Sequence, residues 1–390
     1  MTKLARRVEG LTASATLDIV SRATSLKQQG IDIVNFGAGE PDFETPRPIK
    51  EATVKALEEN FTRYTPASGI LELKEAVSKK FKKDNGLLYE PSQICICCGA
   101  KHALYNLLQV LCNEGDEVIF GSPYWVSYPE MVRLSGATSK IIETSEKSRF
   151  LITAEGIARA LTPKTKVILL NSPSNPVGSV YTKEELKVII EFVVTKDLFL
   201  ISDEIYEKII FGREHFSPAS FGEEIYRRSA TVNGVSKTYA MTGFRIGYLG
   251  APLAIAKAVA NLQSHSTSNP TSLSQKAAVV AIKGDQNEVA KMVKHFQKRR
   301  DLLYEGLREI PGLVPFPPEG AFYIFCKVSD LGLPSSILAS RWLEEARVAV
   351  VPGEGFGRDG YVRFRFATDE AALREGLRRI KTWVARYARH

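Results

Sequence analysis

The sequence predicts an α/β protein with a mostly parallel seven-stranded sheet and a second, smaller α+β domain. Short apolar runs alternate with helical stretches between residues 46 and 281, and this alternation is typical of a parallel sheet covered by helices. After residue 281, longer helical stretches and fewer strand-like runs follow. The length of 390 residues suits two or three folded units.

Seven short apolar runs are the expected strands of the large sheet. They lie at residues 94–98, 117–120, 140–143, 167–170, 198–202, 230–232 and 246–250. A helix is expected at 103–111, soon after the first of these strands.

The remaining residues predict the smaller domain. Helices are expected at 275–283, 288–308, 335–347 and 370–387, and strands at 321–326, 349–351 and 361–366. The first 45 residues offer a short helix at 15–29 and a turn at 37–42, which is too little to form a core of their own. We therefore expect a large domain of residues 46–281 and a small domain that combines residues 1–45 with 282–390.

Composition and charge indicate an ordinary globular protein. Hydrophobic residues make up 44% and charged residues 25% of the chain, which excludes a long disordered or collagen-like protein. The net charge of +8 is modest and favours anionic small molecules as readily as nucleic acid. Five cysteines, no secretory signal and no run of 18 apolar residues predict a cytoplasmic protein without a membrane segment. Cys95 and Cys98 have C-x-x-C spacing, but they lack a second ligand pair, so we expect them in the core.

Ligands of open parallel sheets bind at the carboxyl ends of the strands, so these ends are the first candidates for a site. The run 94–98 leads into Gly99-Ala100-Lys101 and then a helix. Free backbone N–H groups at such a helix start can bind an anion such as phosphate. The same turn is also common where nothing binds, so both interpretations stay open.

Asp203 and Lys237 stand out at later strand ends. Asp203 follows the run 198–202, where a carboxylate can hold a buried cation such as a protonated pyridine nitrogen; helix capping is the alternative. Lys237 lies in a small, largely uncharged segment, where an ammonium loses its proton more readily, as Schiff-base chemistry with a carbonyl requires. An inert, exposed lysine is the alternative. Ser236 and Arg245 would complete a phosphate site.

Eight short motifs occur together along the chain. They are Gly39-Glu-Pro-Asp42, Tyr64-Thr-Pro-Ala-Ser-Gly69, Ser122-Pro-Tyr-Trp125, Asn175-Pro-Val-Gly178, Ser202-Asp-Glu-Ile-Tyr206, Ser236-Lys237, Gly243-Phe-Arg245-Ile-Gly247 and Val350-Val-Pro-Gly353. In this order and spacing the sequence resembles the class I pyridoxal-phosphate-dependent aminotransferases over nearly its whole length. The resemblance implies the aspartate aminotransferase-like fold of pyridoxal-phosphate-dependent transferases and a ping-pong transfer of an amino group.

The resemblance also implies which residues surround pyridoxal 5′-phosphate. Lys237 would bind the cofactor aldehyde covalently and then carry the proton. Asp203 would pair with the pyridine nitrogen. Tyr206 and Asn175 would hydrogen-bond the ring hydroxyl oxygen, and Trp125 would stack on the ring.

The resemblance implies a second set of residues that bind the phosphate of the cofactor. This phosphate would be bound by Gly99, Ala100, Lys101, Ser236 and Arg245. Tyr64 would reach in from a second subunit, so the resemblance implies a homodimer with shared active sites.

The substrate α-carboxylate would be bound by the two-pronged guanidinium of Arg363, assisted by the Gly39 backbone and Asn175. Arg365 departs from the family, whose members usually carry a serine at this position. Because residues two apart in a strand share a face, both guanidiniums can approach one region, and the share of each stays open.

Substrate choice rests on fewer residues. The sequence is similar to the bacterial aspartate aminotransferases, in which the lysine of the strand–helix turn binds the distal carboxylate. Lys101 holds this position, and Thr16 matches a helper near the N-terminus; a role of Lys101 at the phosphate is the alternative. The expected reaction moves an amino group between aspartate or glutamate and a 2-oxo acid. The same branch includes aspartate/prephenate and aromatic aminotransferases.

Two further functions are alternatives. One is a β-lyase on the same scaffold, and the other is a cofactor-sensing regulator that binds DNA. The 45 residues before the large domain are too few for a winged-helix module, so we expect no nucleic-acid partner. The histidines show no metal-ligand spacing, so we expect no metal, and His215 is expected at the surface.

Overall fold

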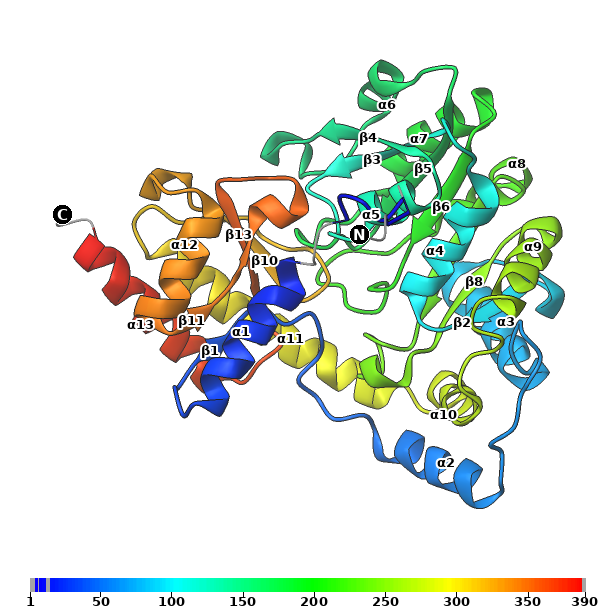
Figure 1. Cartoon of the computed structure of the whole chain (residues 1–390), viewed down its shortest axis with the longest axis horizontal. Coiled ribbons are helices and arrows are strands. Elements are labelled where there is room, and N and C mark those ends of the chain that lie inside the picture. The colour runs from blue at the N-terminus through cyan, green and yellow to red at the C-terminus, as the bar shows by residue number, and fades with distance from the viewer. Residues whose placement is uncertain (1–3, 6, 12–14, 388–390) are drawn as a thin grey trace.

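The structure, a computed structural model, describes residues 4–5, 7–11 and 15–387. Its elements form two groups, with the large sheet and its helices in one and α1, α12 and α13 in the other (Figure 1). The helix α11 (Asn287–Arg308) extends from the second group toward the first (Figure 1). It contributes Phe296 to the core of the second group and Val289 to a cluster of the first.

All seven expected strands form one sheet within the described residues. Its order is β2-β8-β7-β6-β5-β3-β4. The bounds are β2 (Ile94–Cys97), β3 (Glu117–Ser122), β4 (Thr138–Glu143), β5 (Thr165–Asn171), β6 (Phe199–Asp203), β7 (Ser229–Gly234) and β8 (Gly247–Gly250). Pairing is parallel from β7 through to β4, whereas β8 runs antiparallel to β2 and β7. The prediction of a mostly parallel seven-stranded sheet is confirmed.

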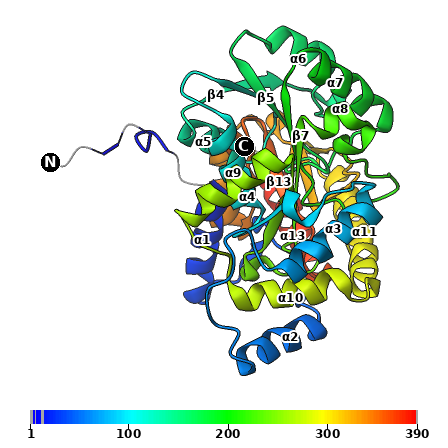
Figure 2. The same cartoon turned by 90° about the vertical axis from the view of Figure 1, so that its right-hand side faces the viewer.

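Helices cover both faces of this sheet, because successive side chains of a strand point to opposite faces. Val118 and Val167 pack toward α4 (Ala100–Leu111), α5 (Tyr128–Leu134) and α9 (Leu253–Ser264). Their neighbours Ile119 and Ile168 pack toward α6 (Ala154–Ala160), α7 (Lys183–Thr195) and α8 (Glu223–Tyr226). The edge formed by β2 and β8 is covered by α3 (Leu71–Asn85) and α10 (Ser272–Lys283). Next to α10 lies α2 (Arg47–Glu58) (Figure 2).

Local sequence explains where several helices begin and end. The Thr182 side chain accepts from the backbone N–H of Glu185 at 3.2 Å, and the Glu185 carboxylate accepts from the backbone N–H of Thr182 at 2.8 Å. This capping box starts α7. At the end of α3, Gly86 takes a left-handed conformation with φ of 67°, which glycine adopts without steric cost.

The second group is built on an antiparallel sheet with the order β12-β13-β10-β9. The bounds are β9 (Val314–Pro315), β10 (Tyr323–Lys327), β12 (Val351–Pro352) and β13 (Tyr361–Arg365). Phe322, Trp342 and Phe364 fill its core together with α11, α12 (Ser335–Arg341) and α13 (Glu370–Tyr387).

The N-terminal segment docks on this second group, as expected. The strand β1 (Val34–Asn35) pairs in parallel with β11 (Val348–Ala349), and Ile19 of α1 (Ala15–Gln28) packs near Leu343. The expected single strand 349–351 is wrong, because the chain changes sheets at Val350 and forms β11 and β12 instead. The domain boundaries at residues 46 and 282 stay a prediction.

The helices and the cysteines of the chain were compared with the expectations from the sequence. Among the residues that the structure describes, none of the helices combines the length and the apolar character needed to cross a bilayer. All five cysteines carry free thiols, and Cys95 lies fully buried in β2.

Candidate active site

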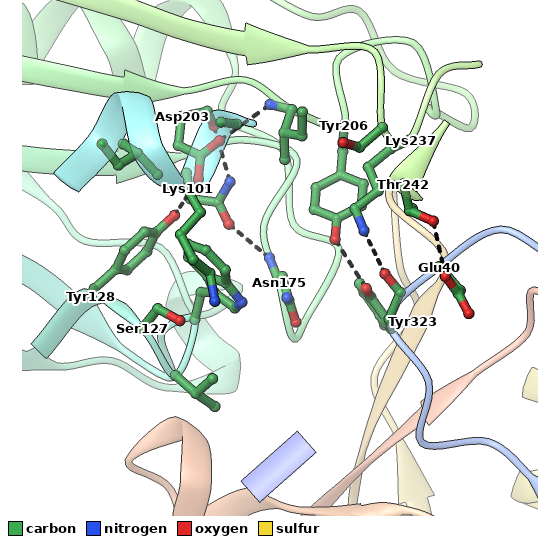
Figure 3. Close-up of a pocket in the computed structure, with 18 of the residues that line it drawn as sticks. Glu40, Lys101, Ser127, Tyr128, Asn175, Asp203, Tyr206, Lys237, Thr242 and Tyr323 are labelled. Carbon is green, nitrogen blue, oxygen red and sulfur yellow. Dashed lines mark hydrogen bonds between the residues drawn. The ribbon is translucent and has the colours of Figure 1, made fainter. Parts of the chain in front are cut away.

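A cavity of about 390 Å³ lies at the carboxyl ends of the parallel strands, where Tyr323 and Arg363 of the second group also line it. Asp203 and Tyr128 lie on one side of it and Lys237 and Tyr323 on the other, with Asn175 between them (Figure 3). Eleven of the residues predicted from the sequence line this cavity: Gly39, Ala100, Lys101, Trp125, Asn175, Asp203, Tyr206, Ser236, Lys237, Arg245 and Arg363.

Asp203 is the last residue of β6 and is 4% exposed. Its Oδ2 accepts a 2.7 Å hydrogen bond from the hydroxyl of Tyr128, and its Oδ1 accepts a 3.3 Å bond from the backbone N–H of Ile205. Burial raises the pKa of Asp203 to about 6, although the Tyr128 bond acts against this rise. A cation placed beside this carboxylate would therefore be held strongly.

Glu204 points away from Asp203 into a separate buried cluster. Its carboxylate accepts hydrogen bonds from Ser202 at 2.8 Å and Ser217 at 2.5 Å, and it contacts the His215 ring at 2.9 Å. The expectation that His215 lies at the surface is wrong, since this contact buries the side chain to 9% exposure.

This buried cluster has the donor set of a metal site. The ligand atoms of Glu204, Glu207 and His215 lie within 4.8 Å of one another. The ammonium of Lys80 already forms an ion pair with Glu207, and Lys80 also donates to Asn85 at 2.7 Å. A lysine thus supplies the positive charge that compensates these acids.

Lys237 follows β7, and its Nζ donates a 2.5 Å hydrogen bond to the carbonyl of Gly39. Burial lowers the pKa of Lys237 to about 8, with the nearby carboxylate of Glu40 acting against this and the cation Arg363 adding to it. The neutral amine is therefore accessible near physiological pH, as an attack on a carbonyl carbon requires.

Arg363 lies on β13 and is 1% exposed. It donates to Oδ1 of Asn175 and to the carbonyl of Gly37, both at 2.9 Å, and its guanidinium lies over the Tyr323 ring at 4.2 Å from the ring centre. No described residue accepts from its Nε. Burial lowers the pKa of Arg363, so an incoming carboxylate would gain from pairing with it. The main-chain carbonyl that assists Arg363 belongs to Gly37, whereas that of Gly39 is used by Lys237.

The turn after β2 forms a narrow cradle with Arg245. Gly99 has φ of 92°, and a Cβ atom there would lie 2.4 Å from Nη2 of Arg245. A Cβ on Gly247 would lie 2.1 Å from the backbone N of Ala100. Glycine is needed at both positions because β8 and the guanidinium approach the helix start so closely. This N-terminus of α4, with Arg245 and the buried Ser236 beside it, suits an anion.

Lys101 lies on the first turn of α4 with its Nζ 5.0 Å from the ring centre of Trp125. Burial lowers the pKa of Lys101, and the neighbouring charge of Arg245 adds to this effect. The lysine therefore faces the cavity beside an aromatic ring, and a second anionic group of a ligand would stabilise its charge.

The profile of one protein family, described as aminotransferase class I and II, matches residues 31–380. The chain belongs to the class I and II aminotransferases. Among its relatives, the aspartate aminotransferase of Geobacillus stearothermophilus is 47% identical over 98% of this chain and 99% of that protein. The aspartate/prephenate aminotransferase of Thermus thermophilus is 43% identical over 99% of this chain and 100% of that protein.

A solved structure supports the same assignment. The structure of aspartate aminotransferase from Thermus thermophilus with maleate covers 98% of this chain and 100% of its own, at a TM-score of 0.95 and 43% identity. The family and the fold predicted from the sequence of this aminotransferase are confirmed.

Among the lining residues of this aminotransferase's cavity that were not predicted, three carry titratable side chains. Tyr128 lies at the start of α5. Its position three residues after the predicted Trp125 was the available signal in the sequence. Tyr323 lies in an apolar strand, and its hydroxyl contacts that of Tyr206 at 2.9 Å. Glu40 accepts a 2.9 Å hydrogen bond from Thr242 at the edge of the cavity (Figure 3).

Three predicted residues are not among the described residues that line the cavity. Gly99 shapes the cradle without being among the described lining residues. Tyr64 is 90% exposed, so it does not serve the cavity of its own chain in this structure. Thr16 lies in the first turn of α1, but its side chain is outside the described residues.

Proposed function

We propose that this aminotransferase moves an amino group between aspartate or glutamate and a 2-oxo acid, with pyridoxal 5′-phosphate as cofactor. The observation that carries the proposal is that Lys237, with its pKa lowered to about 8, and the buried Asp203 line the same cavity from opposite sides. The relatives named aspartate aminotransferase support the substrate class.

The residues of the cavity fit this cofactor. The cradle at Gly99, with Arg245 and Ser236, suits the phosphate. Asp203 suits a protonated ring nitrogen, and the amine of Lys237 suits the aldehyde. When bound, pyridoxal phosphate withdraws electrons from the substrate Cα and so acidifies its proton.

The side chains of the protein have distinct tasks in this proposal. The amine of Lys237 would hold the cofactor aldehyde, and its Nζ would take up the proton from the substrate Cα and return it. Asp203 would hold a charged ring nitrogen. Tyr206 and Asn175 would bind the ring hydroxyl oxygen, and Trp125 would provide an aromatic surface for the ring.

Arg363 and Lys101 are proposed to bind the two carboxylates of the substrate. Arg363 is a buried, planar donor that lines the cavity, and its Nε has no acceptor among the described residues, which suits the α-carboxylate. Lys101 lies beside Trp125 and suits the distal carboxylate of aspartate or glutamate. Thr16 and the backbone of Gly39 are proposed helpers at these two positions.

A second candidate activity is the transamination of prephenate or of aromatic amino acids. A relative named aspartate/prephenate aminotransferase is 43% identical to this chain, which favours this candidate over others. The discriminating experiment is a matrix of amino donors against 2-oxo acids, including prephenate, with purified protein and cofactor. Aspartate with 2-oxoglutarate should give the highest kcat/KM. A higher value with prephenate would favour the second candidate, and no transfer from any donor would contradict both.

We also propose a homodimer in which Tyr64 reaches the phosphate of the partner subunit. Four large apolar side chains are more than half exposed between residues 54 and 71, namely Val54, Leu57, Tyr64 and Leu71. The loop of Tyr64 is held by two buried amides, since Gln275 donates to Thr65 at 2.9 Å and Gln263 donates to the carbonyl of Ala67 at 2.5 Å. Sedimentation equilibrium should give twice the chain mass of 43.2 kDa, and a monomer would contradict this part of the proposal. With five free cysteines, the enzyme is proposed to work in the cytoplasm.

A further inference from the structure

Arg365 lies two residues beyond Arg363 on β13, and the two guanidiniums form hydrogen bonds with different partners. Arg363 reaches the Asn175 side chain and the carbonyl of Gly37. Arg365 donates from Nη1 to the carbonyl of Glu40 at 3.1 Å and from Nη2 to the carbonyl of Asn35 at 3.2 Å. It is not among the described residues that line the cavity. Arg365 therefore contacts the chain segment that borders the cavity rather than the cavity itself.

The segment of residues 35–40 is held through its carbonyl oxygens. The backbone N–H of Arg365 donates to the carbonyl of Phe36 at 2.9 Å, and Lys237 donates to that of Gly39 at 2.5 Å. Together with the guanidinium contacts, the carbonyls of residues 35, 36, 37, 39 and 40 all have a donor. Arg365 supplies three of these five donors, including those at both ends of the segment.

A guanidinium is suited to this contact. Its N–H groups form a rigid fork that can span two carbonyls, whereas a lysine ammonium is a single point donor and a serine side chain is far shorter. Burial lowers the pKa of Arg365, and the carboxylates of Asp42 and Glu40 act against this change. The charged form of Arg365 is thus favoured by Glu40 and the carbonyls of this segment, and by Asp42 two residues beyond it.

We propose that Arg365 is a positioning residue for the substrate α-carboxylate. Arg365 holds both ends of residues 35–40 and so fixes the position of the Gly39 backbone. Through the carbonyl of Gly37 it also fixes the position of the Arg363 guanidinium. The inference rests on the proposed function, in which Arg363 binds the α-carboxylate. Because every amino acid carries this carboxylate, Arg365 acts on aspartate and phenylalanine alike, whereas Lys101 acts on substrates with two carboxylates.

The test is equilibrium binding of two unreactive carboxylates, maleate and 3-phenylpropionate, to the protein loaded with pyridoxal phosphate, measured by titration calorimetry. For Arg365→Ser both ligands should bind about tenfold more weakly, since two charge-assisted hydrogen bonds that hold the site are lost. Arg365→Lys should recover part of both affinities. In steady-state assays the KM values for aspartate and phenylalanine should rise by similar factors, while kcat changes less than about threefold. A general loss of folded enzyme would instead lower kcat and leave KM unchanged.

Arg363→Lys and Lys101→Ser are the reference variants. If Arg363→Lys weakens neither ligand, the proposed α-carboxylate site is wrong and the role of Arg365 falls with it. Suppose that Arg363→Lys weakens the binding of both ligands but Arg365→Ser weakens the binding of neither. The positioning role of Arg365 is then overturned, while the proposed function stands. The same conclusion follows if Arg365→Ser weakens the binding of maleate alone, which is the result expected for Lys101→Ser. Should Arg365→Ser fail to fold, Arg365→Lys decides, and wild-type affinity of that variant for both ligands overturns the proposal.

Discussion

The hydroxyl of Tyr128 donates a 2.7 Å hydrogen bond to the buried carboxylate of Asp203. The bond lowers the pKa of Asp203, which burial raises, so it favours the charged form that would hold a ring nitrogen. Tyr128 in turn packs edge-on against Trp125, with ring centres 5.4 Å apart. One tyrosine thus connects the electrostatic partner of the proposed cofactor ring with the aromatic side chain proposed to cover it.

Replacement of Tyr128 by Phe should therefore raise the pKa of Asp203 further. The acid limb of the pH profile of kcat/KM should move to higher pH, and kcat/KM at pH 7 should fall about tenfold, since one hydrogen bond to a charged group is lost. Tyr124→Phe is the matched control, because Tyr124 packs on Phe120 with ring centres 5.3 Å apart and has no contact with Asp203 among those the structure describes. The role of Tyr128 would be refuted by an unmoved acid limb.

Replacement of Asp203 by Asn should stabilise the ligand-free protein while it damages catalysis. Between pH 3.8 and about 6 the folded protein keeps a proton on Asp203 that the unfolded chain has lost. Above pH 6 the buried charge therefore costs about 1–3 kcal/mol of unfolding free energy, and below pH 4 it costs nothing. Denaturant unfolding of both proteins at pH 7 and pH 4 measures this. If the difference in unfolding free energy between Asp203→Asn and the wild-type protein is the same at both pH values, the buried-charge explanation is contradicted.

The reaction of the ligand-free protein with pyridoxal phosphate should follow the protonation of Lys237. The neutral amine attacks the aldehyde, and burial lowers the pKa of Lys237 to about 8. The rate of covalent capture should rise with pH and level off above about pH 9. Stopped-flow absorbance provides the rate, and Lys237→Ala should lack this phase. A rate that still rises steeply at pH 10 would indicate an ordinary, solvated lysine.

Replacement of Lys101 by Ser tests whether Lys101 binds the distal carboxylate of the substrate. The value of kcat/KM should fall about 100-fold for aspartate, because a charge-assisted contact is lost, and much less for phenylalanine. The affinity for pyridoxal phosphate, measured by absorbance titration, serves as the control. Equal losses for both amino acids, together with weaker cofactor binding, would assign Lys101 to the phosphate instead.

The sequence was sufficient to locate most of the candidate site. Parallel strands bring their carboxyl ends to one edge, so residues that follow different strands, such as Asp203 and Lys237, could be placed together from chain order alone. Gly99 of the cradle was also predicted, because free backbone N–H groups at a helix start bind anions, whereas the close approach at Gly247 became visible only in the structure.

The rest depends on long-range packing that no local pattern encodes. Tyr206 and Tyr323 are 117 residues apart and meet because β10 of the second group reaches the cavity that Tyr206 lines. His215 lies in a polar stretch typical of a surface loop, yet it is buried because Glu204 needs a partner. The shared face of Arg363 and Arg365 followed from strand geometry, but their separate partners became visible with the position of residues 35–40.

Lys237 is proposed as the amine that binds the cofactor opposite Asp203. The most direct measurement is to load the purified protein with pyridoxal phosphate, reduce it with borohydride and map the modified peptide by mass spectrometry. We expect one phosphopyridoxyl group per chain, on Lys237, with none incorporated in Lys237→Ala. Stable incorporation at another lysine, or a wild-type protein that remains unmodified, would contradict it.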